Sequence, residues 1–506
     1  MEIPTDNIEQ RRRLPTARTD VSPASVAAQR WRIPLPGLRL TVSERRLLLG
    51  TVDLLALSLA LLVALAARYD YSFSWRTLLA APIYFLLLGG VWFGWALFFD
   101  CYDLPRTADA SQSVWSAGLA AVLTALTYLA IPYYTPHFPA SRLSAYMFTA
   151  LAVVSVTAWR LFYAAVFSQP SFQKRLLVVG AGTVGSALAR QLAGTPAVGN
   201  PYAGSGFLLV GFVDDDPDKA GSEVEAVPVL GNRRDLARLV AEHNADLVVV
   251  AIRHPSTIHP ELLQALLDCR EQGIRIEPMT HLYERLTGRV PVEYAGHDLR
   301  VILPLRDAPT QRLFWAAKRL VDLGSALLGL LALGLLVPGV ALANALLCPG
   351  PLFHRQVRLG RGGKPFSLIK FRSMIPGAEQ RGQPVWACEG DRRVTPVGCL
   401  LRPARLDELP QCWNILKGEM SLVGPRPERP EFVADLVKEV PFYQARHAVR
   451  PGLTGWAQVR YRYGSSVEDA LVKLQYDLYY IKHQSVYLEL SILVKTLTVV
   501  LGLQGR

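Results

Sequence analysis

Four long apolar stretches near the start of the chain constrain its fold more strongly than any other feature. They cover residues 47–67, 78–99, 114–132 and 143–167 of the 506. Each approaches the roughly 20 apolar residues that an α-helix needs to cross a bilayer, and 51% of the whole chain is hydrophobic. The sequence therefore predicts a membrane protein with an N-terminal four-helix transmembrane bundle over residues 44–168.

Charged residues beside these stretches predict how the bundle is oriented. Nine arginines precede the first stretch, and residues 1–43 form a tail rich in Arg and Pro that we expect to be disordered. Lys174 and Arg175 follow the last stretch. The positive-inside rule then puts both ends of the bundle in the cytoplasm, which requires an even number of crossings. The few charged residues of the stretches are expected near their ends, which favours an anchoring or dimerising bundle over a transport path.

The net charge indicates the kind of partner, and the cysteines indicate the redox setting. The net charge of +12 suits anionic lipid and anionic substrates. Nucleic acid is the weaker interpretation, because the sequence shows no basic patch with interleaved aromatic residues. None of the six cysteines stands in a C-x-x-C pair or has His partners at metal spacing, which predicts a reduced setting and no structural zinc.

Residues 172–290 alternate between strand and helix patterns. An apolar strand, Lys174–Val179, leads into a glycine-rich turn and then into a helical run. The turn matches G-x-G-x-x-G through Gly180, Gly182 and Gly185. A second strand ends at Asp214, which in a nucleotide-binding domain would face a ribose. We predict a doubly wound, Rossmann-like α/β accessory domain, and whether a nucleotide occupies it stays open.

A different kind of apolar segment follows a linker over residues 291–319. Residues 320–348 are apolar, but Pro338 and Gly339 interrupt them near the middle. One interpretation is a fifth crossing, since the length is sufficient. The other is a re-entrant helix, because a proline followed by a glycine can bend a helix sharply and return it to the same face. The last apolar stretch, residues 486–503, is expected to lie along the membrane interface.

Two adjacent carboxylates, Asp407 and Glu408, open a short predicted helix. Pro410 suits the first turn of such a helix, where a missing N–H costs nothing. Asp is also a preferred N-cap residue, so helix capping is the ordinary interpretation of this pair. Cations stand on both sides of the pair in the sequence: Arg402, Arg405 and Arg426. They favour a functional interpretation over the ordinary one.

Two further segments flank this pair. Lys370 and Arg372 stand two residues apart in a stretch that alternates like a strand, so we expect both on one face. Arg426 lies between Pro425 and Pro427, whose fixed φ angles would hold its guanidinium ready for bidentate phosphate contact. Each segment alone fits a solvated basic face or a turn. Together they place a carboxylate pair and several phosphate-binding cations in one compact region.

Four ordered motifs in this region resemble those of a known family. They are residues 370–374, 406–411, 421–427 and 450–458. Through them residues 312–506 resemble the bacterial sugar transferases, the monotopic phosphoglycosyl transferases that act on polyprenyl phosphate. The resemblance extends less specifically to the whole chain, because large members carry the same N-terminal additions. It implies a re-entrant helix at residues 320–348 and a small α+β catalytic domain over residues 349–506.

The resemblance also implies a reaction. A sugar 1-phosphate would pass from a nucleoside-diphosphate sugar to a polyprenyl phosphate such as undecaprenyl phosphate, the first membrane step of exopolysaccharide or glycoconjugate assembly. Asp407 would form a covalent phosphosugar intermediate. Glu408, the second catalytic residue, would bind metal or move a proton, and Asp407 with Glu408 would hold Mg²⁺. The cations expected at the substrate phosphates are Lys370, Arg372, Arg402, Arg426 and Arg450. The implied setting is the bacterial inner membrane, with the catalytic domain and both termini cytoplasmic and a homodimer as the assembly.

The chain departs from the family's pattern at two positions. Val337 stands where the family usually has Ser before the breaking proline, so the break would rest on Pro338 and Gly339. Cys399 stands where a basic residue is frequent, which leaves any role at that position open.

Two other functions fit parts of the sequence. A membrane-anchored, NAD-dependent enzyme that modifies sugar nucleotides would also join membrane helices to a Rossmann-like domain. Such enzymes use a Tyr-x-x-x-Lys pair, and no Tyr of this sequence has a Lys four residues later. A non-catalytic nucleotide-sensing membrane protein would leave the segment from Asp407 to Arg426 without a role, so we rank it third.

Overall fold

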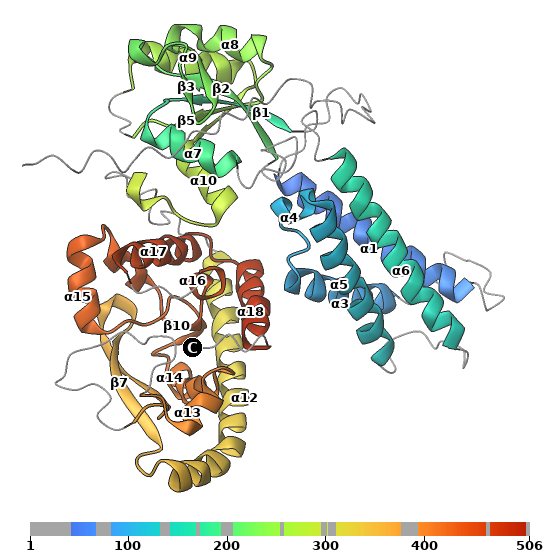
Figure 1. Cartoon of the computed structure of the whole chain (residues 1–506), viewed down its shortest axis with the longest axis vertical. Coiled ribbons are helices and arrows are strands. Elements are labelled where there is room, and N and C mark those ends of the chain that lie inside the picture. Colours follow the sequence, from blue (N-terminus) through green and yellow to red (C-terminus); the bar gives the residue numbers. More distant parts are fainter. Residues whose placement is uncertain are drawn as a thin grey trace, which may run out of the picture. The chain divides into compact units, whose positions relative to one another are not determined.

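The computed structural model describes most of the chain. The described residues are 42–66, 82–131, 142–167, 173–193, 206–253, 258–294, 301, 310–375, 393–461 and 466–501. The predicted basic tail lies, up to residue 41, outside the described residues. Three parts follow one another along the chain: an N-terminal helical bundle, an α/β domain, and a mixed domain that begins with one long helix (Figure 1).

The N-terminal bundle is built from four apolar helices and one short connecting helix. These are α1 (Val42–Ala66), α3 (Pro82–Phe98), α4 (Leu104–Ala108), α5 (Ala110–Ala130) and α6 (Arg142–Val166). Each apolar helix overlaps one of the four predicted stretches. By length and composition α1, α5 and α6 can cross a membrane, whereas α3 has only 17 residues. Fully buried Ala121 of α5 and Ala152 of α6 let the helices approach closely.

A buried ion pair joins α1 to α6 inside this bundle. The side chains of Asp53 and Arg160 are both fully buried, and Arg160 also donates to the carbonyl of Cys101 at 2.7 Å. Cys101 lies in the turn after α3, so the pair lies near an end of the bundle, where the sequence predicts charged residues. Each charge is tolerated inside the bundle because the other neutralises it, and removing one partner would leave a buried charge without compensation.

The α/β domain contains a six-stranded sheet in the order β3-β4-β2-β1-β5-β6. Its elements are β1 (Lys174–Val179), α7 (Thr183–Ala193), β2 (Phe207–Val213), η4 (Pro217–Lys219), β3 (Glu223–Val224), β4 (Val227–Gly231), η5 (Arg233–Asp235), α8 (Leu236–Glu242), β5 (Leu247–Val250), α9 (Pro260–Glu271), β6 (Arg275–Pro278), α10 (Met279–Thr287) and η7 (Val292–Tyr294). Every neighbouring pair is parallel except β3 with β4. The strand order reverses at β1, as in a doubly wound fold, and ligands of such sheets bind beyond the carboxyl ends of the strands near the reversal.

Side chains alternate across this sheet and give it two cores. Leu176 and Val178 of β1 pack on one face with α7 and α10. Leu177 and Val179 pack on the other face with α8 and α9. Because helices cover both faces, successive residues of a strand are all buried, which is why the strands appear in the sequence as continuous apolar runs.

One long helix, α12 (Thr310–Leu347), precedes the last domain. It begins at Thr310 and not at the predicted residue 320, so the end of the predicted linker is helical. Pro338 lies inside α12, and the ribbon bends sharply near its C-terminal end in Figure 1. A proline removes a backbone hydrogen bond and clashes with the preceding turn, which accounts for a bend there. Arg312–Leu347 is also long and apolar enough to cross a membrane, so length does not decide between crossing and re-entry.

Polar side chains tie the first half of α12 to the domain that follows. The Lys318 ammonium donates to the carbonyl of Val423 at 3.0 Å and to the carboxylate of Glu489 at 2.7 Å. The Asp322 carboxylate accepts from the hydroxyl of Ser421 at 2.9 Å and from the next backbone N–H at 2.8 Å. The leucines on the opposite side of the helix are exposed: Leu320, Leu327, Leu331, Leu335, Leu342 and Leu346. A stripe of this kind suits contact with lipid.

The last domain is small and mixes helices with two short sheets. Its elements are β7 (Phe353–Leu359), η8 (Arg361–Gly363), β8 (Pro365–Phe371), α13 (Pro396–Leu401), η10 (Leu406–Gln411), α14 (Cys412–Lys417), β9 (Ser421–Val423), α15 (Pro430–Glu439), η11 (Tyr443–Ala448), β10 (Gly452–Thr454), α16 (Trp456–Arg460), α17 (Val467–Lys482) and α18 (Val486–Leu501). β7 and β8 form an antiparallel hairpin, and β9 pairs with β10 in parallel. Its largest core gathers side chains of α15 to α18 around the fully buried Leu474 and Leu478.

A single side chain, Asn414, fastens β8 to α14. It is fully buried, its amide donates to the carbonyl of Ser367 at 2.8 Å, and its Oδ1 accepts from the backbone N–H of Ile369 at 3.2 Å. These backbone groups lie on the edge of β8 that is not paired with β7. The contact holds the strand that carries Lys370 against the helix that follows Asp407.

The segment after α10 packs on the last domain. Val290 and Val292 are 0% and 3% exposed and belong to that domain's core. The backbone N–H of Val290 donates to the carbonyl of Gln475 in α17 at 3.0 Å. Val290 and Val292 are thus buried beside α17, at the place where the sequence predicts the start of a linker.

Candidate active site

The carboxylate pair lies in a short 3₁₀ helix that continues into α14. This helix, η10, follows Arg405, whose φ is 55°. A non-glycine residue in that conformation costs about 1–3 kcal/mol, and such strain clusters at functional sites. No side chain caps η10, and Asp407 and Glu408 lie within its first turn. The structure therefore excludes the capping interpretation of Asp407.

Asp407 is buried, and no described residue forms a polar contact with its carboxylate. It is 9% exposed, and within the described part of the chain its carboxylate makes no hydrogen bond or ion pair. Burial raises the pKa of Asp407, and the neighbouring charge of Glu408 raises it further. The cationic groups of Lys370, Arg402 and Arg426 act in the opposite direction. A buried carboxylate that no donor satisfies is costly for stability, and it is available to a ligand.

Glu408 is the opposite case, because arginines hold it as an anion. The Arg426 guanidinium donates to one oxygen of Glu408 at 3.0 Å, and Arg405 lies 3.8 Å from the other. Burial alone would raise the pKa of Glu408, but Arg426 and Arg405 outweigh burial and lower it. The two neighbouring carboxyl groups therefore differ in their proton affinity, which is the arrangement expected where each has its own chemical role.

Lys370 completes the charged surroundings of Asp407. It lies on β8, opposite His354 of β7. Burial lowers the pKa of Lys370 to about 8, and the guanidinium of Arg358 adds to the effect, while the charge of Asp407 opposes it. An ammonium whose pKa is close to neutral pH can lose its proton within the working range of an enzyme.

A second buried pair fixes the Arg426 loop from behind. Arg446 of η11 donates to the carbonyl of Arg426 at 3.0 Å and to the carboxylate of Asp477 on α17 at 2.8 Å. Arg446 and Asp477 are 5% and 2% exposed. This network was not predicted from the sequence. The signal was present, since Asp477 stands between the buried aromatic and aliphatic residues of α17, where a charge needs a partner.

Arg372 does not share a face with Lys370. The strand ends at Phe371, and the Arg372 guanidinium turns to the C-terminal end of α12, where it donates to the side chain of Asn344 and to the carbonyl of Cys348. Gly350, with φ of 147°, leaves it room, because a Cβ there would meet the guanidinium at 2.5 Å. Arg372 is buried in this position, so the expectation that it binds phosphate beside Lys370 has no support in the structure.

The two remaining predicted cations, Arg402 and Arg450, lie in different parts of the domain. Arg402 ends α13, and its charge lowers the pKa of Asp407. Arg450 lines a small pocket beside α12 together with Trp315 and Tyr480, and the lining of that pocket does not include Asp407 or Glu408. The structure thus brings Lys370, Arg402 and Arg426 to Asp407, and it places Arg450 at the pocket beside α12.

The predicted glycine turn of the α/β domain forms as expected. Gly180 has φ of 105°, and a Cβ at Gly185 would meet the carbonyl oxygen of Gly180 at 2.1 Å. A Cβ at Gly182 would meet nothing within 4 Å. The Asp214 carboxylate accepts a hydrogen bond from the backbone N–H of Ala181 at 2.6 Å. A side chain of the domain itself therefore satisfies this backbone donor of the glycine turn.

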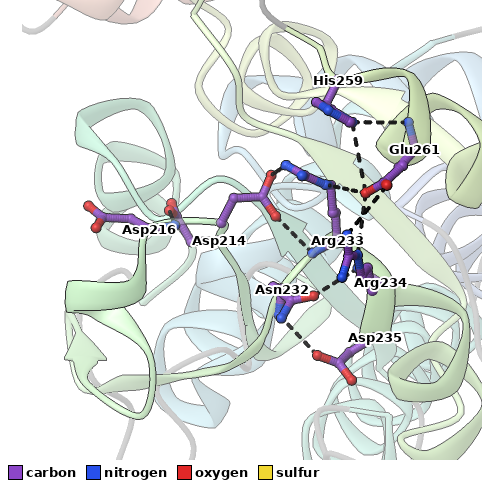
Figure 2. Close-up of polar contacts among 9 residues, drawn as sticks. Asp214, Asp216, Asn232, Arg233, Arg234, Asp235, His259 and Glu261 are labelled. Atoms are coloured by element: carbon purple, nitrogen blue, oxygen red, sulfur yellow. Dashed lines mark hydrogen bonds and ion pairs between the residues drawn. The ribbon is translucent and has the colours of Figure 1, made fainter.

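A charged cluster lies beyond β2 and β4 at the same edge of that sheet (Figure 2). Arg233 donates to Glu261 at 2.9 Å and to Asp215 at 3.1 Å, and Arg234 lies 3.4 Å from Glu261. His259 accepts from the backbone N–H of Glu261. The arginines of this cluster already have carboxylate partners, and their contacts are largely exposed ones, which stabilise little.

A metal would have few protein ligands. Among the described residues, no group of three or more His, Cys, Asp or Glu side chains could hold a metal ion. Mg²⁺ needs only one or two carboxylates when substrate phosphates supply the rest. Asp407 fits such a role because its oxygens accept no hydrogen bond from the described residues, and Glu408 stands beside it.

With this geometry in place, comparison with known proteins gives the class. The family described as "Bacterial sugar transferase" matches residues 313–503, and the family described as "CoA-binding domain" matches residues 97–278. The "Uncharacterized sugar transferase EpsL" of Bacillus subtilis (strain 168) is 39% identical over 192 residues, which cover 37% of this chain and 89% of EpsL. The chain belongs to the bacterial sugar transferase family.

Longer relatives match more of the chain. The UDP-N-acetylgalactosamine-undecaprenyl-phosphate N-acetylgalactosaminephosphotransferase of Aeromonas hydrophila is 38% identical over 260 residues, 51% of this chain and 60% of the relative. The UDP-glucose:undecaprenyl-phosphate glucose-1-phosphate transferase of Xanthomonas campestris pv. campestris is 33% identical over 306 residues, 60% of this chain and 62% of the relative. The chain thus spans about three fifths of the length of these relatives.

Proposed function

We propose that this protein transfers a sugar 1-phosphate from a UDP-sugar to undecaprenyl phosphate. The observation that carries the proposal is Asp407, a buried carboxylate with no hydrogen bond or ion pair in the described part of the chain, surrounded by the charges of Lys370, Arg402 and Arg426. A carboxylate held in this state is suited to react with an anionic phosphate brought in by cations. The names of the relatives supply the substrate class.

The reaction has two displacement steps. An oxygen of Asp407 attacks the β-phosphorus of the UDP-sugar, and the bond from that phosphorus to the bridging oxygen breaks, so that UMP leaves with the electron pair. The sugar phosphate is then an acyl phosphate on Asp407. An oxygen of undecaprenyl phosphate attacks the same phosphorus, and the carboxylate leaves as an anion. The product is undecaprenyl diphosphate sugar, and no oxidant or reductant takes part.

The charged residues around Asp407 make this approach of anions feasible. Lys370 and Arg402 lower the negative potential at the carboxylate. Arg426, fixed by Arg446, can contact a phosphate while it still neutralises Glu408. Asp407 and Glu408 would hold Mg²⁺. When bound there, the ion would neutralise charge on the diphosphate.

The setting we propose is the bacterial inner membrane, with the catalytic domain and both termini cytoplasmic and a homodimer as the assembly. The donor is water-soluble and the acceptor is a lipid, so the site must stand at the membrane surface. Re-entry of α12 at Pro338 and Gly339 would achieve this. Leu333, Val337, Val340 and Ala343 pack on one small core at the spacing of a single helix face, so the proposed re-entry rests on Pro338 inside α12 and on the bend there.

Labelling tests the re-entry. Single cysteines introduced at Arg312 and Arg355, both exposed, should react with a membrane-impermeant reagent from the same side of the membrane. Replacing Pro338 by Ala and Gly339 by Leu restores helix propensity, by about 3 kcal/mol for the proline, and a Cβ at Gly339 meets nothing within 4 Å. This double variant should gain a population with the two sites on opposite sides. If the two cysteines react from opposite sides of the membrane in the protein that keeps Pro338 and Gly339, re-entry is refuted.

Intact-protein mass spectrometry tests the covalent step. Incubation with a panel of UDP-sugars and no acceptor should add the mass of one phosphosugar, and undecaprenyl phosphate should then remove it. The Asp407→Asn variant should gain no mass. Asp435→Asn is the matched control, because Asp435 is an exposed carboxylate of the same domain that pairs with Lys438. UMP release that needs the acceptor from the outset, with no adduct, would contradict the proposal.

A further inference from the structure

Glu284, the last acidic residue of α10, is buried against the transferase domain. Its side chain is 3% exposed. One carboxylate oxygen accepts from the Lys482 ammonium at 2.8 Å, and the other lies 2.8 Å from Nε2 of His483. The α/β domain therefore places a fully engaged carboxylate at the C-terminal end of α17.

The residues that follow α10 hold the same helix at its middle. Val290 donates its backbone N–H to the carbonyl of Gln475, and the Arg289 guanidinium lies 5.1 Å from the centre of the Tyr476 ring. The indole N–H of Trp456 donates to the carbonyl of Gly288 at 2.9 Å. α17 is thus held at two points by residues that precede the transferase region.

The residue between these two points leads to the active site. Asp477, two residues after Gln475, binds Arg446, and Arg446 donates to the backbone carbonyl of Arg426. The Arg426 guanidinium in turn contacts Glu408 beside Asp407. Each contact in this series is a hydrogen bond or ion pair of 2.8–3.0 Å. The points at which Glu284 and Val290 contact α17 lie within less than three turns of that helix.

We propose that Glu284 is a positioning residue for the sugar-phosphate transfer site, acting through α17 and Arg446 on Arg426. By fixing the end of α17, Glu284 fixes Asp477, and Asp477 fixes the arginine that holds the Arg426 loop. The α/β domain thereby adjusts how Arg426 meets Glu408 and the phosphate. The kinetic part of this inference rests on the proposed function, whereas its structural part does not.

The shorter relative explains why this link is an addition. The alignment with EpsL covers 37% of this chain and 89% of EpsL, so EpsL lacks most of the sequence that this chain carries. A protein named as a sugar transferase therefore exists at less than half the length of this chain. In the present chain, Glu284 is expected to tune the site and not to create it, so its loss should reduce the rate without abolishing it.

Hydrogen exchange on the full chain in nanodiscs tests the structural link. Glu284→Gln should speed backbone exchange at the end of α17, in η11 and in residues 421–427. Glu277→Gln is the matched control: Glu277 pairs with Arg285 at 2.6 Å, a contact within the α/β domain, and touches none of these segments. Lys482→Gln should repeat the effect from the other side. Equal protection of η11 in all three variants would overturn the inference, and this readout stands even if no transfer is found.

Kinetics test whether the link reaches the chemistry. Glu284→Gln should lower kcat by about 2- to 30-fold, the range of coupling carried by such networks, with KM for the UDP-sugar changed less. Tyr443→Phe removes the hydroxyl that accepts from Arg446 at 2.6 Å. If both residues act through Arg446, the double variant should lose less than the product of the single losses. Losses that multiply, or a Glu277→Gln loss as large, would overturn the inference.

Discussion

The two carboxylate-rich regions of this chain look alike in sequence and differ in how their charges are satisfied. At the edge of the α/β sheet, Asp214 accepts from the backbone N–H of Ala181 and lies 3.5 Å from the Lys219 ammonium. In the transferase domain, Asp407 is as deeply placed but makes no polar contact among the described residues. A motif whose groups satisfy one another can serve the fold alone. A buried group left unsatisfied requires another explanation, and a reacting ligand provides one.

Replacing the two aspartates should give the largest contrast. Asp407→Asn should lower the rate of UMP release by about 10³-fold or more, because the amide cannot act as the nucleophile. Asp214→Asn should leave it within about twofold, since its contacts lie in the other domain. Both rates are measured on purified protein in nanodiscs. Near-normal release by Asp407→Asn would end the covalent mechanism, and a comparable loss in a folded Asp214→Asn protein would bring the α/β domain into the reaction.

Exchanging an arginine for a lysine at each site should give a smaller contrast. Arg426→Lys should lower kcat/KM by about 10²-fold, because one ammonium cannot contact Glu408 and a phosphate as a guanidinium does. Arg234→Lys, at a side chain that is 76% exposed, should have little effect. Steady-state kinetics on both variants check this. Equal losses would mean that Arg426 matters only for folding, which circular dichroism of the same samples would reveal.

The pH dependence should follow the two shifted groups. Lys370 must carry its proton to act as a cation, and its pKa is lowered to about 8, so kcat/KM should fall by about tenfold per unit above that pH. Asp407 must be ionised to attack, and its pKa is raised, so the acid limb should lie above the ordinary range of Asp. Lys370→Arg keeps the charge at high pH and should remove the alkaline limb. An unchanged alkaline limb in that variant would assign it to another group.

The glycine turn should give the smallest effect on transfer. Gly182→Ala places its Cβ in open space and should leave UMP release and thermal unfolding unchanged. Gly185→Ala should lower stability by about 1–3 kcal/mol, because its Cβ would overlap the carbonyl of Gly180. If a nucleotide binds on the turn, its stabilising effect on thermal unfolding should be weaker in Gly182→Ala. A Gly182→Ala protein that folds but does not turn over would contradict modular catalysis.

Local patterns predicted much of the fold. The strand Lys174–Val179 has the bounds expected, and each of the four predicted apolar stretches overlaps a helix of the bundle. Both follow from apolar spacing, which the chain carries locally. The start of α12 was not predicted. Residues 310–319 are amphipathic, and contacts such as that of Lys318 with Glu489 stabilise their helical conformation.

The site was predictable in its centre and not in its support. Asp407, Glu408, Lys370 and Arg426 could be predicted because their spacing resembles that of a family. The position of Arg372 could not, because it depends on where β8 ends. The pairing of Arg446 with Asp477, and of Glu284 with Lys482, joins residues 31 and 198 positions apart. Such contacts are decided by tertiary packing, and no local pattern encodes the partner.

The amide of Asn414 has a consequence for how the protein behaves among copies of itself. The outer edge of β8 would otherwise present unpaired N–H and C=O groups, which are templates for a strand of another molecule. By taking up the groups of Ser367 and Ile369, Asn414 acts as a short substitute strand. A Leu at this position would fill a similar volume and leave the edge open. We therefore expect that the loss of this one side-chain amide would favour association between copies of the protein, besides disturbing the site.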